Sequence, residues 1–243
     1  MQPVLRGEFR KLTTVRGPWL LLAAEPLLVV AGISGLVVSG GNLQDPAVQS
    51  RALSHVGLAA MLTLVLGILA MAGEYRHRTI TDTYLGFPGR GRVVAAKMAV
   101  TALVGAVASV VTTGVALATV AIWWTAKGAT FTLSTPDAWR TVIGGVAVNI
   151  AFAAIGVGIG ALIHNVVVAV AAALAWIALI EGIVGQLLGS GLTRWLPFAA
   201  SEALDRSATA QVLPQWGAAV LLLGYTAAFV IAALLTTLRR DVT

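Results

Sequence analysis

The chain has 243 residues, of which 58% are hydrophobic and only 11% are charged, and its mean hydropathy is +0.90. A soluble globular domain is nearer half apolar and a quarter charged, so this composition argues against a water-soluble enzyme and against a disordered chain. Cysteine is absent, which excludes disulfides, thiolate nucleophiles and cysteine metal ligands.

Residues 1–16 precede the first apolar stretch and contain a predicted amphipathic helix. Within residues 2–15, apolar and basic side chains recur with helical spacing. They are Val4, Leu5, Phe9 and Leu12 on the apolar side and Arg6, Arg10 and Lys11 on the basic side. Such a helix lies along the lipid headgroups of one leaflet. A solvated basic leader is the alternative interpretation.

Six apolar stretches follow, and they predict an all-α polytopic membrane protein that forms one transmembrane domain over residues 1–243. A spanning helix needs about 20 apolar residues, and backbone polar groups within lipid must be bonded internally, which requires helices here. The third stretch is too long for one straight crossing, so it tilts or projects beyond the bilayer. The stretches cover residues 17–38, 55–73, 93–124, 140–163, 166–188 and 216–238.

The basic residues predict the orientation of these helices. With the N-terminus inside, 11 of the 16 Lys and Arg residues fall on the inner side, and 5 fall on the outer side. Cytoplasmic loops carry such an excess, so we expect both termini in the cytoplasm. The excess of Arg over Lys is typical of a high-GC coding bias, and we expect the inner (cytoplasmic) membrane of a bacterial cell as the location.

The first cytoplasmic loop, residues 73–97, is the most informative segment. Thr79 and Asp82 fit a capping box, which predicts a short helix from about Ile80 to Gly86. On that helix Ile80, Tyr84 and Leu85 are expected to share a face. The run Phe87-Pro88-Gly89 ends the helix, because proline cannot continue it. An apolar face on a short helix suits docking into a groove of another protein, although an ordinary basic loop is the alternative.

The loop resembles that of the ABC-2-type permeases, the six-span membrane subunits of one class of ATP-binding-cassette exporters. The resemblance rests on an ordered run, residues 74–81 (EYRHRTIT), followed by Leu85, Pro88, Arg90 and Lys97. Arg78 stands where relatives often have glycine. In that family the loop, here residues 74–92, carries a coupling helix that sits on the ATPase subunit. The resemblance implies that the docking residues are Glu74, Arg76, Thr79, Ile80, Asp82, Tyr84, Leu85, Pro88 and Arg90.

The resemblance also implies a function and partners. Two ATPase subunits would bind ATP and magnesium, and a second permease copy or a paralogue would complete the pathway. The substrate would be hydrophobic or amphipathic: a drug, peptide, lipid or glycan leaving the cytoplasm. The chain lacks the Gly-x-x-x-x-Gly-Lys-Ser/Thr phosphate loop, so we expect no cofactor, no catalytic residue and no enzymatic activity of its own. We expect no nucleic-acid partner, because no soluble basic face exists.

Three polar residues within the spans are candidates for the translocation path. Glu25 and Glu181 lie several residues inside their apolar stretches, and Asn149 lies in the fourth. A carboxylate within the bilayer costs on the order of 2.5–3.5 kcal/mol, so it faces a cavity or a partner. A structural role is the alternative for each residue. If the protein works alone, Glu25 and Glu181 are the only candidates for ion coupling in a secondary transporter.

Other motifs have simpler interpretations. Gly156 and Gly160 lie four residues apart in an apolar span and predict close helix packing. Ser34 in Gly-Ile-Ser-Gly resembles a membrane-protease serine, but no histidine base is expected near it. The scattered histidines predict no metal site. The outer loop, residues 189–215, is expected to hold one or two short helices. A regulatory or immunity subunit with the same fold stays an open alternative.

Overall fold

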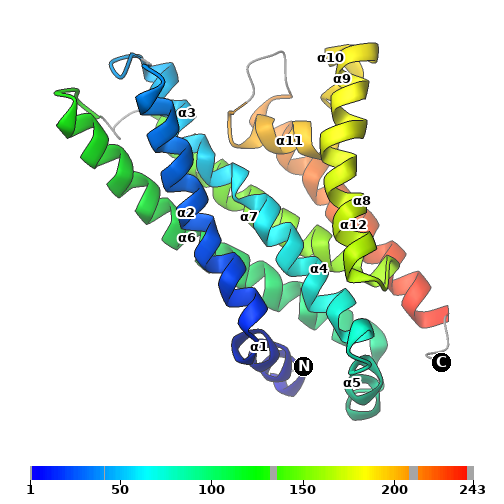
Figure 1. Ribbon diagram of the computed structural model, residues 1–243. Helices are drawn as coiled ribbons and strands as arrows, with labels where there is room; N and C mark the ends of the chain where they lie inside the picture. Colours follow the sequence, from blue (N-terminus) through cyan, green and yellow to red (C-terminus); the bar gives the residue numbers. More distant parts are fainter. Residues whose placement is uncertain (1, 41, 132–135, 208–212, 240–243) are drawn as a thin grey trace.

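The computed structural model describes residues 2–40, 42–131, 136–207 and 213–239, and these residues form helices joined by short connections (Figure 1). No strand occurs in this part of the chain, in agreement with the predicted all-α class. The helices are α1 (Gln2–Thr14), α2 (Arg16–Val38), α3 (Pro46–Leu58), α4 (Ala60–Arg76), α5 (Ile80–Gly86), α6 (Arg90–Ala126), α7 (Pro136–Leu162), α8 (Val166–Ala175), the π-helix η1 (Trp176–Glu181), α9 (Gly182–Leu188), α10 (Ser190–Thr193), α11 (Pro197–Leu204) and α12 (Gln215–Arg239).

Within the described residues, six helical segments are long and apolar enough to cross a bilayer, in agreement with the six predicted apolar stretches. They are Arg16–Val38, Pro46–Arg76, Arg90–Ala126, Pro136–Leu162, Val166–Leu187 and Gln215–Leu235. The second begins at Pro46, earlier than predicted, because Pro46 occupies the first turn of α3 and the Asp45 carboxylate accepts a hydrogen bond from the Ala47 N–H at 2.8 Å. This cap starts a helix in a stretch that hydropathy alone does not mark.

The second segment is divided into α3 and α4 at Ala59, and Asn149 of α7 supports the break. The fully buried Asn149 donates from Nδ2 to the Val56 carbonyl at 3.0 Å and to the Gly145 carbonyl at 2.9 Å. The Thr63 hydroxyl lies 3.2 Å from the Asn149 carbonyl oxygen. Buried polar groups need such partners, so Asn149 acts here as an interhelical hydrogen bonder.

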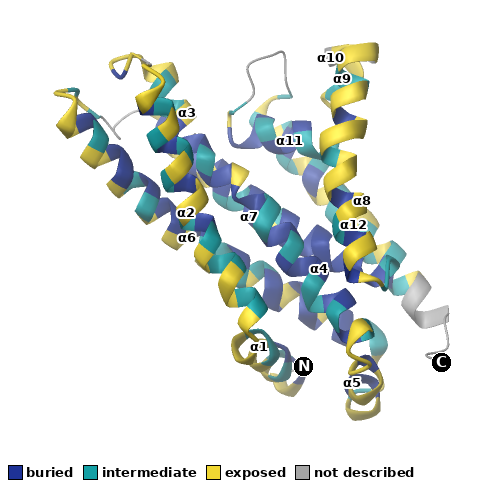
Figure 2. Cartoon of the chain, viewed as in Figure 1, coloured by how far each residue is buried: buried dark blue, intermediate teal, exposed yellow. Residues whose placement is uncertain are grey.

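The centre of the bundle is the contact between α4 and α7, where glycines let the two backbones approach. A Cβ atom added at Gly156 would overlap the carbonyl oxygen of Leu64, and one at Gly160 would lie 2.9 Å from the carbonyl oxygen of Ile68. Gly67 of α4 meets the α7 backbone in the same way. The predicted packing role of Gly156 and Gly160 is therefore confirmed. Figure 2 shows buried residues concentrated along α4 and α7.

The two ends of the bundle differ in what they carry. One end holds α1, α5 and the end of α12, and we call it the α1/α5 end (Figure 1). The opposite end holds α10, α11 and the start of α3, and we call it the α3/α11 end. Between them the outward faces of α2 and α8 expose apolar side chains, as a lipid-facing surface requires. Examples are Leu20, Leu27, Val167 and Leu174.

Candidate functional site

The predicted loop helix is present as α5, over the predicted residues Ile80–Gly86. It follows a turn in which Arg78 has a φ of 57°, a left-handed conformation that glycine adopts without steric cost. Arg78 thus occupies a glycine-type position. The predicted capping box is wrong, because the Thr79 side chain makes no capping hydrogen bond. The Thr79 N–H instead donates to the Glu74 carbonyl at 3.0 Å, which closes the turn.

The aromatic face of α5 is turned toward the rest of the chain. Ile80 and Tyr84 are only 3% and 8% exposed, and they belong to an apolar cluster with Val4 of α1 and Val93 of α6. The Arg90 guanidinium carbon lies 5.4 Å from the centroid of the Tyr84 ring, a cation–π contact. Our expectation that this face is free for a partner is therefore wrong. Ile80 and Tyr84 do share a face, as their i, i+4 spacing predicts, but that face packs against the rest of the chain.

The outward face of α5 is a different set of side chains. Leu85 is 77% exposed, and Thr81 and Asp82 are also exposed. Arg76 and Thr79, which precede the helix, and Pro88, which follows it, are exposed as well. We call these six residues the α5 surface. Of the three residues predicted to form the apolar docking face, only Leu85 is available to another molecule.

Four charged side chains form a network, the ion cluster, between α1, α4 and α6. Lys97 of α6 is 1% exposed, and its Nζ lies 2.6 Å from Glu8 Oε2 and 2.6 Å from Glu74 Oε1. Lys11 of α1 contacts the same two carboxylates, at 2.9 Å from Glu8 and 2.7 Å from Glu74. Thr83 of α5 joins the network, because its hydroxyl lies 2.9 Å from Lys11 Nζ and 3.1 Å from Glu74 Oε2.

The charges of the ion cluster cancel, and every Lys97 N–H has an acceptor, since the Ala70 carbonyl takes the third at 3.2 Å. Burying an ammonium group is costly unless it is paired and hydrogen-bonded, and here both conditions hold. Burial alone would lower the pKa of Lys11, but its hydrogen bonds to Glu74 and Glu8 outweigh this effect and raise the pKa. Lys11 therefore stays charged at neutral pH.

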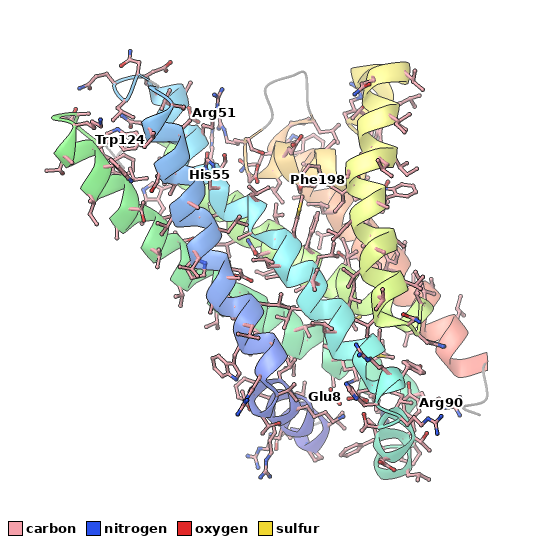
Figure 3. The ribbon with its side chains drawn as sticks, viewed as in Figure 1. Glu8, Arg51, His55, Arg90, Trp124 and Phe198 are labelled. Carbon is pink, nitrogen blue, oxygen red and sulfur yellow. The ribbon has the colours of Figure 1, made fainter. Side chains whose placement is uncertain are left out.

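The ion cluster fixes α1 against the bundle, which differs from the predicted arrangement. The apolar positions of α1 were expected to face lipid and its basic positions water. Instead Val4 and Glu8 are buried, while Phe9 is 49% exposed. Figure 3 shows Glu8 at the α1/α5 end of the bundle. Helix α1 is therefore held by charge as well as by apolar contact, and the same contacts hold the inner side of α5.

A cavity of about 510 Å³ opens beside the ion cluster, between α1, α2, α4 and α6. It has one charged side and one apolar side. The charged side is formed by Glu8, Lys11, Glu74 and Lys97, and the apolar side includes Leu12, Pro18, Leu69 and Val100. A cavity with these two kinds of wall fits an amphipathic molecule.

Glu25 of α2 is completely buried, and among the described residues neither of its carboxylate oxygens has a partner in hydrogen-bonding geometry. Thr112 of α6 is near enough to interact with the group, but no hydrogen bond of acceptable geometry links the two. An unpaired carboxylate in this position is costly as an anion. Its role on a translocation path stays a prediction.

Glu181 lies in η1, and its carboxylate caps α11. Its oxygens accept hydrogen bonds from the backbone N–H groups of Phe198, at 3.0 and 3.1 Å, and Ala199, at 3.1 Å. The indole Nε1–H of Trp176 donates to the same carboxylate at 3.1 Å. A carboxylate at a helix N-terminus satisfies N–H groups that have no partner within the helix. This geometry accounts for a buried Glu181 without a transported ion.

The protease-like serine and two of the three histidines have other partners. The Ser34 hydroxyl accepts a hydrogen bond from Trp123 Nε1 at 2.9 Å, and His55 Nδ1 donates to a carbonyl of its own helix at 2.9 Å. His164 stacks on Tyr75, with ring centroids 3.9 Å apart. No group of three or more His, Cys, Asp or Glu side chains with metal-site geometry occurs among the described residues.

Comparison with models of protein families and with curated proteins finds no match to this chain. The candidate site therefore stands on its own geometry. Sequence reasoning missed Glu8 and the position of Lys97 within the ion cluster. The available signal was that Glu8 is the only acidic residue of the first helix, four residues after the apolar Val4.

Proposed function

We propose that the chain is the membrane subunit of an ATP-binding-cassette exporter of the ABC-2 type, and that a separate ATPase subunit docks on the α5 surface. The observation that carries the proposal is a short helix beyond the second and third spans, with an outward face that includes the highly exposed Leu85. Its inner face is fixed to α1 and α6 by Ile80, Tyr84 and the ion cluster. A helix held in this way can transmit force.

In the proposed mechanism, two ATPase subunits bind ATP and magnesium and close on each other. Each ATPase subunit moves as a rigid body and displaces the α5 helix that is docked on it. Because Thr83 and Glu74 link α5 to Lys11 and Lys97, the displacement reaches α1 and the start of α6 directly. The path between two permease copies, or one copy and a paralogue, then changes its opening. The chain itself performs no covalent chemistry in this scheme.

The proposal places the α1/α5 end in the cytoplasm of a bacterial cell, with both termini inside and the protein in the inner membrane. The excess of basic residues at the predicted inner ends supports this orientation. The transported molecule is hydrophobic or amphipathic. The cavity beside the ion cluster supports the amphipathic class, because it joins a charged wall to an apolar one.

The test is purification from the native membrane in mild detergent, followed by identification of co-purifying proteins by mass spectrometry. We expect a soluble ATPase at about one copy per permease. Leu85→Asp should remove it, whereas Leu192→Asp, at the 55% exposed Leu192 of α10 at the opposite end, should not. If the protein arrives alone, or if Leu85→Asp retains the ATPase, the docking proposal is wrong. Ile80 and Tyr84 are unsuitable for this test, because substituting buried residues would disturb the fold.

Glu25 favours a second candidate function, a stand-alone transporter coupled to an ion. Its carboxylate is completely buried, and neither oxygen has a hydrogen-bond partner among the described residues. Such a group can take up a proton or a cation during a transport cycle. For this candidate, Glu25→Gln in proteoliposomes would abolish transport driven by a proton gradient. For the exporter, the same variant would retain ATP-driven transport.

A further inference from the structure

A polar cavity of about 390 Å³ lies at the α3/α11 end, far from the α5 surface. It is open on one side and is lined by the C-terminal part of α2, by α3, and by α11 with the residues that follow it. Figure 3 places Arg51 and His55 of α3 on the side that faces α11, where Phe198 lies. The size is within the range of pockets that hold small organic ligands. No part of the proposed export mechanism uses this cavity.

The carboxylates in the cavity lack cationic partners. Asp205 is 3% exposed and Glu202 is half-buried, and neither forms an ion pair with any described residue. Among the described residues, the hydrogen-bond donors to Asp205 come from Ser207, whose N–H lies 2.9 Å from Oδ1. Burial raises the pKa of both groups, that of Asp205 to about 7. Two such carboxylates facing a cavity are a feature of ligand sites.

The other polar groups of the cavity mostly present acceptors. The hydroxyls of Ser54 and Ser201 donate to carbonyls of their own helices, at 2.9 and 2.7 Å, so each oxygen can still accept a hydrogen bond. His55 donates from Nδ1 to the Arg51 carbonyl at 2.9 Å. Among the described residues that line the cavity, the exposed Arg51 is the one Lys or Arg.

The cavity thus combines a basic side chain with two acidic ones, and a cationic ligand beside the acids would favour their ionised form. Arg51 and the two carboxylates line the same space, yet no ion pair joins them in the described part of the chain. The Asp205 carboxylate packs closely on α3, because a Cβ atom at Gly57 would overlap it. A ligand that carries an ammonium group and a nearby anionic group would satisfy both kinds of charge at once.

We propose that this cavity binds a small zwitterion, with a primary ammonium group received by Asp205, Glu202 and the serine oxygens, and an anionic group received by Arg51. The three N–H donors of a primary ammonium match the surplus of acceptors. A trimethylammonium group has no N–H and does not match them. The ligand is either a free small molecule or the headgroup of an ethanolamine phospholipid at the membrane surface, since the two share this chemistry.

The test measures binding to the purified full chain by isothermal titration calorimetry, with phosphoethanolamine and phosphocholine as probes. We expect phosphoethanolamine to bind about 10-fold or more tightly than phosphocholine. Asp205→Asn and Glu202→Gln should each weaken phosphoethanolamine binding by about 10-fold. The control Asp137→Asn, at an exposed position outside the cavity, should leave it unchanged. If Asp205→Asn does not fold, Glu202→Gln decides.

A second arm identifies the source of the ligand. The protein is placed in nanodiscs with equal amounts of phosphatidylethanolamine and phosphatidylcholine, and retained lipid is measured by native mass spectrometry. Selective retention of phosphatidylethanolamine that Glu202→Gln abolishes supports the proposal with a lipid headgroup as ligand. Phosphoethanolamine binding without selective lipid retention supports it with a free zwitterion. Equal binding of the two soluble probes, or normal binding by both cavity variants, would overturn it.

Discussion

Replacing Lys97 with methionine would remove one ammonium group from the ion cluster and keep most of the side-chain volume. Lys97 Nζ lies 2.6 Å from both Glu8 and Glu74, and the side chain is 1% exposed. Without it, two carboxylates share the single ammonium of Lys11, and the net charge of the cluster falls from zero to −1. Removing one partner of a buried ion pair costs about 3–5 kcal/mol. We expect the free energy of unfolding to fall by this amount.

The assay is denaturant unfolding of the detergent-solubilised protein, with limited proteolysis of α1 as a local readout. The double variant Lys97→Met, Glu8→Gln restores a neutral cluster, so it should recover most of the loss. The control is Lys127→Met, because Lys127 is exposed at the opposite end. A loss below about 1 kcal/mol for Lys97→Met would place the cluster among weak surface pairs and refute the reasoning. Additive losses in the double variant would also contradict it.

Three further predictions use the same unfolding assay. Arg78→Gly should raise the free energy of unfolding by about 1 kcal/mol, because Arg78 has a φ of 57°; a decrease would contradict this. Gly156→Ala should lower it by about 1–3 kcal/mol, because the new Cβ atom would overlap the Leu64 carbonyl; an unchanged value would contradict the close contact. The free energy of unfolding should fall as pH rises from about 4 to about 7. The pKa of Asp205 is about 7 in the folded state and 3.8 in the unfolded state, so between these values only the native state holds the proton. Arg51, His55 and Glu202 are the other charged or titratable side chains lining that cavity, and Asp205→Asn should flatten the profile.

The spans and the loop helix could be predicted because local physics decides them. In lipid the backbone must bond to itself, so hydropathy alone identifies the six segments. The loop helix ends before Pro88 because proline cannot continue it. Gly156 and Gly160 indicated a close contact, since small residues at this spacing let two helices approach. None of these predictions needed the position of a distant residue.

The orientation of α5 could not be predicted, because it depends on what covers the helix. The spacing of Ile80 and Tyr84 predicts a shared face, but not whether a partner or this chain covers it. Here this chain covers it, in an apolar cluster that includes the sequence-distant Val4. In the same way Glu8 and Lys97 lie 89 residues apart. Lys97 counts toward the topology signal, but nothing local indicates that the two residues meet.

Glu25 and Glu181 also show what sequence alone does not decide. For each of them the sequence left open a place on the translocation path or a structural role. The difference arises from a neighbour that only the fold supplies. The N-terminus of α11 lies against this carboxylate and provides N–H donors from Phe198, 17 residues after Glu181, and from Ala199. No helix terminus reaches Glu25, whose oxygens have no partner among the described residues. A buried carboxylate whose hydrogen bonds are complete has little capacity to take up an ion, whereas an unpartnered one retains it. Of the two, Glu25 is therefore the residue at which ion coupling and ATP-driven export can be distinguished.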